Sequence, residues 1–252
     1  MLSIRGLVLQ AGERRLCAPF DWDVRAGECW GVLGPNGAGK STLLHSLAGL
    51  LPPAAGAIRL DGAPIDNLAP RARARRLGLM AQDDGDAFPA SVLETLLTGR
   101  YPWLGPWGWE GEADRAAART ALAAVDLGGF EHRDVRTLSG GERRRVALAT
   151  LLVQNPALML LDEPLNHVDL AHQQRILALL RERAASGNHA VVMVLHDLNQ
   201  AQRSCDHVLL LGRGQAETGP TAELLEATRL SRLFGCPLRQ LDCEGGRVWV
   251  AD

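Results

Sequence analysis

The sequence predicts an α/β fold, because short β-rich runs alternate with helical patterns along most of its 252 residues. Residues 157–161 and 189–195 are rich in Leu, Val and Met, which is typical of parallel strands that are buried on both faces. A glycine-rich loop at residues 34–39 stands between a predicted strand and a predicted helix. These observations favour a core with a mixed or parallel sheet.

The N-terminal part of the chain is β-rich. Its runs are residues 2–9, 15–24 and 29–33. Gly12 and residues 26–28 separate these runs as turns separate strands, which predicts an antiparallel β subdomain. A helix is expected from Lys40 to about Leu50, because Pro52 and the proline after it end a helix there.

The middle of the chain changes to a helical pattern. Helices are expected at residues 91–100, 111–126 and 140–154. We interpret residues 82–155 as a helical subdomain that is inserted between strands. Residues 1–81 and 156–252 then form the core of one domain that spans residues 1–252. The C-terminal part, residues 205–252, mixes short strands with two short helices.

The composition excludes several classes of protein. With 46% hydrophobic and 22% charged residues, the chain is globular rather than disordered. A formal charge of −2 argues against a protein that wraps nucleic acid with a basic surface. Five cysteines without a CxxC pair favour reduced thiols in the cytosol. We find neither a signal peptide nor an apolar run of about 18 residues, so any membrane span is expected on another chain.

A phosphate-binding loop is predicted at residues 34–41, which match the pattern GxxxxGK[ST] between a strand and a helix. Backbone N–H groups of such a loop point inward, and the helix N-terminus adds positive potential. Lys40, the only lysine of the chain, is expected to reach the β- and γ-phosphates, and Ser41 to coordinate Mg²⁺. The residues expected to hold the nucleotide are Gly34, Pro35, Asn36, Gly37, Ala38, Gly39, Lys40, Ser41 and Thr42.

Two carboxylates follow the apolar run that ends at Leu161. Strand ends are where α/β sheets place their active groups, so Asp162 is expected to hold Mg²⁺ directly or through water. Glu163 is expected to polarise the attacking water as a general base. The alternative is that both carboxylates only cap the next helix.

A second anion site is predicted where Ser139, Gly140 and Gly141 open another helix. One chain needs a single γ-phosphate site, so these residues are expected to serve the nucleotide of a second copy of the chain. Taken alone, the stretch would be an ordinary helix N-cap.

The phosphate loop, the LSGGE stretch at residues 138–142 and the strand that ends in Asp162 and Glu163 resemble the nucleotide-binding subunit of an ATP-binding cassette (ABC) transporter. The resemblance covers nearly the whole chain, and the LSGGE stretch is highly specific to that family. Within it, Gln82 matches the glutamine that senses Mg²⁺ and the membrane partner. Asp169 matches a residue that crosses the dimer interface, and His196 matches the histidine that contacts the γ-phosphate.

The resemblance implies a P-loop NTPase core that binds ATP and Mg²⁺ and hydrolyses ATP. It also implies a homodimer that works with integral membrane permease subunits and a substrate-binding protein, and with no nucleic acid, at the cytoplasmic face of the inner membrane. The catalytic residues it implies are Lys40, Gln82, Glu163 and His196. Its metal-binding residues are Ser41, Gln82 and Asp162. Those serving the nucleotide of the second copy are Ser139, Gly140, Gly141 and Asp169.

Three short strings resemble the group of importers that takes up metal chelates, namely ferric siderophores, haem and cobalamin. They are residues 97–102, residues 166–170 with 172–173, and residues 196–199. The alternative that remains is an exporter or a cofactor-assembly ATPase that uses the same kind of ATPase domain. A soluble cassette ATPase that acts on DNA or ribosomes is disfavoured, because the stretch between Gln82 and Leu138 leaves no room for a coiled-coil insertion.

Two features are not explained by the family resemblance alone, namely the residue at Ala11 and the aromatic segment at residues 101–109. The family usually stacks adenine on an aromatic residue where this chain has Ala11, so we expect a weaker preference for adenine unless Arg14, Arg15 or Trp22 substitutes. Residues 101–109 hold three of the six tryptophans and the only tyrosine. Such amphipathic aromatics are suited to a contact with a membrane subunit, or they fold onto the helical subdomain as ordinary core.

Overall fold

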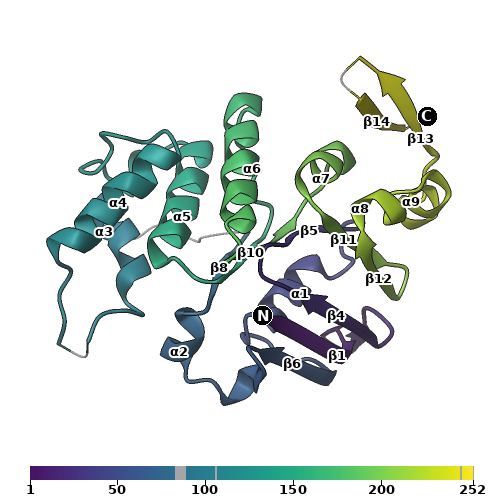
Figure 1. Ribbon diagram of the computed structural model, residues 1–252, viewed down its shortest axis with the longest axis horizontal. Helices are drawn as coiled ribbons and strands as arrows, with labels where there is room; N and C mark the ends of the chain where they lie inside the picture. The colour runs from purple at the N-terminus through teal and green to yellow at the C-terminus, as the bar shows by residue number, and fades with distance from the viewer. Residues whose placement is uncertain (83–88, 106, 245, 252) are drawn as a thin grey trace.

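The computed structural model describes residues 1–82, 89–105, 107–244 and 246–251 (Figure 1). Residues 83–88, at the start of the predicted helical subdomain, and Pro106, within the aromatic segment, lie outside the described residues. Gly245 and the last residue, Asp252, lie outside them as well.

The N-terminal part of the chain forms an antiparallel sheet, as predicted, but the run at residues 29–33 does not belong to it, because this run pairs in parallel with strands of the central sheet. The antiparallel sheet has the order β4–β1–β6–β7, with strands β1 (Leu2–Val8), β4 (Phe20–Val24), β6 (Ala55–Leu60) and β7 (Ala63–Pro64). Strand β4 alternates between buried and exposed residues, so Phe20, Trp22 and Val24 face the interior. The predicted run at residues 15–24 is broken before Phe20, because Pro19 cannot donate to a strand ladder. A two-residue hairpin, β2 (Gln10–Ala11) and β3 (Arg14–Arg15), precedes the break.

The central sheet has the strand order β12–β11–β5–β10–β9–β8. Its strands are β5 (Cys29–Leu33), β8 (Leu77–Met80), β9 (Leu158–Leu161), β10 (Ala190–Val194), β11 (His207–Gly212) and β12 (Gln215–Pro220). All neighbours from β11 to β8 are parallel, and β12 alone is antiparallel to β11. Every residue of β5, β9 and β10 is buried, which for β9 and β10 confirms the prediction made from their apolar runs.

Helices α3, α4 and α5 lie together beside β8 (Figure 1). These helices are α3 (Val92–Leu97), α4 (Glu112–Ala124) and α5 (Gly140–Gln154), with the 3₁₀ turns η2 (Thr98–Arg100) and η3 (Val135–Thr137) between them. They fall within the three predicted helical ranges. The division of the chain into a core and an inserted helical subdomain stays a prediction.

Helix α1 (Lys40–Leu47) starts directly after the glycine-rich loop and packs between the two larger sheets. It ends near Leu47 rather than Leu50, because Gly49 adopts a left-handed conformation with φ 66°. The remaining helices that flank the sheets are α2 (Pro70–Ala74), α6 (Leu170–Ala185) and α7 (Leu198–Ser204), and η1 (Ile65–Asn67) is a 3₁₀ turn.

The C-terminal part contains two short helices and a hairpin that projects past them (Figure 1). These elements are α8 (Thr221–Leu224), α9 (Ala227–Phe234), β13 (Leu238–Cys243) and β14 (Gly246–Ala251). Asn199 of α7 joins the hairpin by bonds to both the N–H and the carbonyl of Trp249, at 2.7 and 3.2 Å.

Two groups of buried apolar side chains hold these layers together. One lies between the antiparallel sheet, α1 and one face of the central sheet, and the other joins the opposite face to α3, α4, α5 and α6. Because both faces of the central sheet are covered, its polar groups concentrate at the strand ends. In the described part of the chain, no helix has both the length and the apolar character needed to cross a bilayer.

Candidate nucleotide-binding site

The polar motifs predicted from sequence meet at one edge of the central sheet. The glycine-rich loop follows β5, Gln82 follows β8, Asp162 and Glu163 follow β9, and His196 follows β10. Since these strands are parallel, their carboxyl ends lie at the same edge. The site is therefore assembled from segments that are far apart in the sequence.

The loop before α1 needs glycine at two positions because of its backbone shape. A Cβ atom on Gly34 would lie 1.9 Å from the carbonyl oxygen of Leu211 in β11. Gly39 has φ 101° and caps α1, and a Cβ atom there would lie 2.6 Å from Cδ1 of Leu16. The loop is thus pressed against its neighbours, and its backbone is available to cradle an anion at the start of α1.

Lys40 is buried at the base of this loop. Its exposed fraction is 6%, and its Nζ donates to the carbonyl oxygens of Gly34 at 2.8 Å and Pro35 at 3.1 Å. Burial lowers the pKa of Lys40, while the charges of Glu163 and Asp162 act in the opposite direction. The ammonium group is therefore held where loop and carboxylates meet.

Asp162 is a buried carboxylate without hydrogen-bond partners of normal geometry among the described residues. Its side chain is 1% exposed, and neither Oδ1 nor Oδ2 is satisfied. Burial raises the pKa of Asp162, and the nearby Ser41 hydroxyl opposes that shift. An orphaned carboxylate beside a hydroxyl is the kind of donor set that Mg²⁺ takes when phosphate oxygens complete its coordination.

The Glu163 carboxylate is the centre of the site. His196 Nε2 lies 2.6 Å from its Oε1, and Gln82 Nε2 donates to its Oε2 at 3.0 Å. The Asn166 side-chain amide also donates to Oε2. The side chain is 10% exposed, and its backbone adopts a left-handed conformation with φ 52°. Three of these four residues were predicted for the site, whereas Asn166 was recognised only as part of a family-like string.

Arg144 is a functional candidate that the sequence reasoning missed. It is 6% exposed and extends from α5 to the ends of β8 and β9. It donates to the carbonyl oxygens of Ala81 and Gln82 at 2.7 and 3.1 Å, to that of Glu163 at 2.9 Å, and to that of Asp162. Its position on the same helix face as the buried Leu148 and Leu151 was the available signal.

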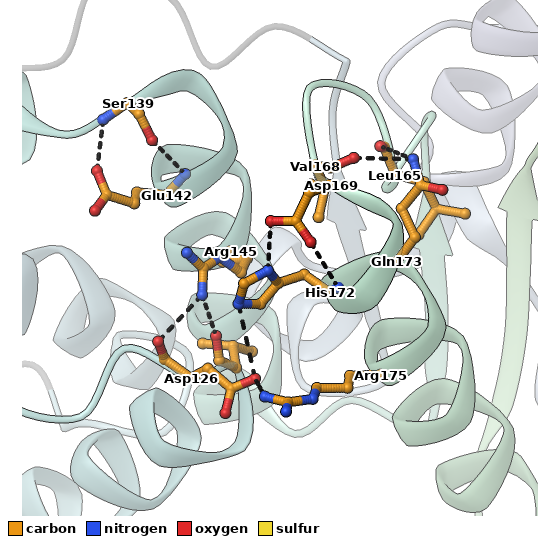
Figure 2. A network of polar contacts seen from close by, with 11 residues as sticks. Asp126, Ser139, Glu142, Arg145, Leu165, Val168, Asp169, His172, Gln173 and Arg175 are labelled. Atoms are coloured by element: carbon orange, nitrogen blue, oxygen red, sulfur yellow. Dashed lines mark hydrogen bonds and ion pairs between the residues drawn. The ribbon is translucent and has the colours of Figure 1, made fainter.

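The N-terminus of α5 carries a capping box (Figure 2). Ser139 Oγ accepts from the N–H of Glu142 at 3.2 Å, and the Glu142 carboxylate accepts from the N–H of Ser139 at 2.7 Å. Gly141 lies close to the loop after Glu163, since a Cβ atom there would be 2.6 Å from the carbonyl oxygen of His167. Within this chain the stretch is an N-cap, and its service to a second copy stays a prediction.

Asp169 caps α6, as Figure 2 shows. Its carboxylate accepts from the N–H of His172 at 3.1 Å and lies 2.6 Å from Nδ1 of the same histidine. These bonds lower the pKa of Asp169. The side chain is 66% exposed, so it remains reachable from outside the chain. Its expected position at a dimer interface stays a prediction.

Trp22 cannot replace the aromatic residue that is missing at Ala11, because it is buried. That side chain is 2% exposed and packs edge-on against Trp30, with ring centroids 5.2 Å apart. Ala11, Arg14 and Arg15 lie in the exposed β2–β3 hairpin. Of the three substitutes expected, the two arginines alone remain accessible.

Comparison with known proteins places the chain in a family. The family model described as "ABC transporter" matches residues 17–166, which is more than half of the chain. The Hemin import ATP-binding protein HmuV of Streptomyces coelicolor is 43% identical over 92% of this chain and 82% of its own length.

Solved structures agree with this match. A putative metal-chelate type ABC transporter in an inward-facing conformation has a TM-score of 0.86 at 29% identity, covering 100% of this chain and 97% of its own. The dimeric structure of MJ0796, a bacterial ABC transporter cassette, has a TM-score of 0.79 at 26% identity, covering 88% and 99%. The chain belongs to the ABC transporter family and is an ATP-binding, ATP-hydrolysing subunit with the P-loop fold of that family.

Proposed function

We propose that this chain powers the import of a metal chelate, such as haem, a ferric siderophore or cobalamin, through separate membrane subunits. The observation that carries the ATPase part is the Glu163 carboxylate, which is held between His196 and Gln82 next to the buried Lys40. The similarity to a hemin importer over most of both chains supports the cargo class. The similarity to a metal-chelate type transporter supports it as well.

In the proposed mechanism the chain's own residues bind and orient ATP. The loop from Gly34 to Thr42 surrounds the phosphates, and the Lys40 ammonium neutralises charge on the β- and γ-phosphates. Glu163 accepts the proton of the attacking water, and His196 and Gln82 hold its carboxylate in place.

Mg²⁺ is assigned to Ser41, Asp162 and Gln82, and would supply charge neutralisation at the phosphate oxygens. The support for this assignment is the buried, unsatisfied carboxylate of Asp162 beside Ser41. Gln82 joins the set because its side-chain amide lies against Glu163, the residue next to Asp162.

We propose a homodimer in which Ser139, Gly140, Gly141 and Asp169 of one copy complete the ATP site of the other. The exposed Asp169 side chain and the similarity to a dimeric cassette support this arrangement. Binding energy of ATP across both copies would then drive closure, and hydrolysis would reopen the dimer. The proposed location is the cytoplasmic face of the inner membrane, with a substrate-binding protein as a further partner of the permease.

The permease contact is proposed at a groove beside the aromatic segment. This groove has a volume of about 460 Å³ and is lined by Arg71 of α2, Thr98, Tyr101 and Gln154 of α5. The base of the segment is fixed, because the Trp103 indole donates to the Gln154 carbonyl at 2.8 Å. Trp107 and Trp109 are 93% and 89% exposed, so they do not serve as core. Tyr101 is the exposed aromatic side chain that lines the groove, and exposed aromatics are typical anchors of a protein interface.

The base assignment predicts the behaviour of Glu163→Gln. The amide keeps the shape of the side chain but cannot accept the proton, so kcat is expected to fall by about 10²–10⁴-fold. ATP binding is expected to persist, and size-exclusion chromatography in the presence of ATP is expected to show that the closed dimer accumulates. Near-normal turnover of this variant would refute the role of Glu163.

The metal assignment predicts that Asp162→Asn makes the fold more stable but abolishes Mg²⁺-dependent hydrolysis. Without Mg²⁺ and nucleotide at pH 7, removing the buried charge is expected to raise the free energy of unfolding by about 1–3 kcal/mol. Burial raises the pKa of Asp162 above its unfolded value of about 3.9, so the ionised form weakens the fold only above that pH. The gain should therefore shrink as the pH falls toward about 4.

Mg²⁺-dependent hydrolysis is expected to be lost in the same variant. Denaturant unfolding across this pH range and steady-state ATPase rates provide the two measurements. Asp66→Asn, at an exposed site, is the matched control and should change neither. Lower stability of Asp162→Asn at pH 7 would contradict the assignment.

The permease contact predicts that the double variant Trp107→Ala, Trp109→Ala keeps its basal ATPase rate. Its affinity for the permease is expected to fall by about tenfold or more, because aromatic anchors dominate interface energy. Leu241→Ala, a half-exposed apolar residue on β13, is the control. Unchanged stimulation of ATPase by the permease in the double variant would reject this surface.

The import function itself is tested by uptake in cells that carry Lys40→Ala in place of the wild type. Labelled haem, ferric siderophore and cobalamin are compared, and loss of one of them alone would identify the cargo. Persistence of all three, while the purified wild type hydrolyses ATP, would favour the exporter or the cofactor-assembly ATPase. Cofractionation with ribosomes or DNA instead of membrane would favour a soluble cassette.

A further inference from the structure

The catalytic edge of the sheet is held together by a side chain from the helical part. Arg144 of α5 reaches two separate strand ends, one after β8 and one after β9. A guanidinium has five N–H donors in a rigid plane, which lets it span two pairs of carbonyl oxygens at once. The N–H of Asp162 also donates to the Met80 carbonyl at 2.8 Å, so the two strand ends are joined directly as well.

We propose that Arg144 is a positioning residue for ATP hydrolysis, which fixes Gln82 and Glu163 relative to each other. The two residues are connected through their side chains at 3.0 Å, and Arg144 binds the main-chain carbonyl of each. The bonds from Arg144 to Gln82 and Glu163 are made to their main-chain carbonyls. The effect of Arg144 is transmitted through the backbone of these two residues.

Arg144 binds the backbone at Glu163, whose conformation is unfavourable. Glu163 has φ 52°, a conformation that costs free energy for a residue with a side chain. A buried cation that satisfies the carbonyl oxygens on both sides of this residue stabilises that conformation. The bond to the Asp162 carbonyl is buried, and the bond to the Glu163 carbonyl is partly buried, which limits competition by water at this residue.

The same arrangement ties the site to α5 as a whole. Ser139 caps this helix, and Arg144 lies five positions further along it. The helix end that carries the LSGGE stretch and the strand ends that carry Gln82 and Glu163 therefore form one hydrogen-bonded unit. This inference rests on the proposed roles of Gln82 and Glu163, and on the ATPase activity of the family.

The test uses the full-length protein with Arg144→Lys. A single ammonium cannot reach both carbonyl pairs, so Glu163 is expected to move and kcat to fall by about tenfold or more. The KM for ATP is expected to stay within about threefold, because the phosphate loop is not altered. Arg115→Lys, the same change on an exposed residue of α4, is the matched control and should leave kcat unchanged.

A thermal melt and a double-variant cycle separate positioning from a general loss of fold. The melting temperature of Arg144→Lys is expected to stay within about 5 °C of the wild type. In a Gln82→Ala background the Lys substitution is expected to add little further loss, because both changes disturb the same pair. Losses of kcat that multiply in the double variant would overturn the proposal.

Two further outcomes distinguish this inference from the proposed function. Slow hydrolysis by Glu163→Gln with normal kcat in Arg144→Lys would overturn the positioning role alone. Normal hydrolysis by Glu163→Gln with slow Arg144→Lys would overturn it together with the base assignment, since Arg144 would then act through another group. The uptake experiment decides the import function independently of both.

Discussion

Burial of opposite charges at one edge of the central sheet is the constraint on which the rest of the structure depends. Lys40 and Asp162 are 6% and 1% exposed. Burying an isolated charged group at such a site costs about several kcal/mol, which is enough to shift its pKa toward the neutral form. Lys40 is compensated by two loop carbonyls, whereas the Asp162 carboxylate is not compensated by hydrogen bonds of the described residues. The Asp162 carboxylate is thus an unsatisfied acceptor that suits a divalent cation, and it lowers the stability of the fold when no cation is bound.

The parts of the site that lie within one short segment could be predicted from the sequence. The loop around Lys40 and the strand end at Asp162 and Glu163 are encoded by residue types at fixed spacing, next to a strand and a helix. The same holds for the buried strands β9 and β10, because a strand covered on both faces must be apolar throughout.

What could not be predicted depends on contacts between distant segments. Arg144 stands in a run of three arginines, and its helical spacing to buried leucines indicates an inward face but does not identify the carbonyls of Ala81 and Asp162 as its partners. The amide of Asn166 reaches Glu163 because the loop after β9 turns back, which requires the left-handed Glu163. Likewise, the exposure of Trp107 is decided by where its loop runs, and not by its composition.

The use of arginine and lysine in this chain follows from the shape of the two cations. Arg144 bridges two pairs of carbonyls, one after β8 and one after β9. Arg145 bridges the carbonyls of Val125 and Asp126 after α4, as Figure 2 shows. A planar fork suits such pairs, since both bonds form from one rigid group. The phosphate loop needs the opposite property, namely a compact charge with donors in any direction that fits beneath a tight turn. A guanidinium at Lys40 would have to fit the space between the Gly34 and Pro35 carbonyls, where the ammonium already makes bonds of 2.8 and 3.1 Å. The one lysine of the chain therefore stands where arginine cannot replace it, and arginines make the contacts that tie α5 to its neighbours.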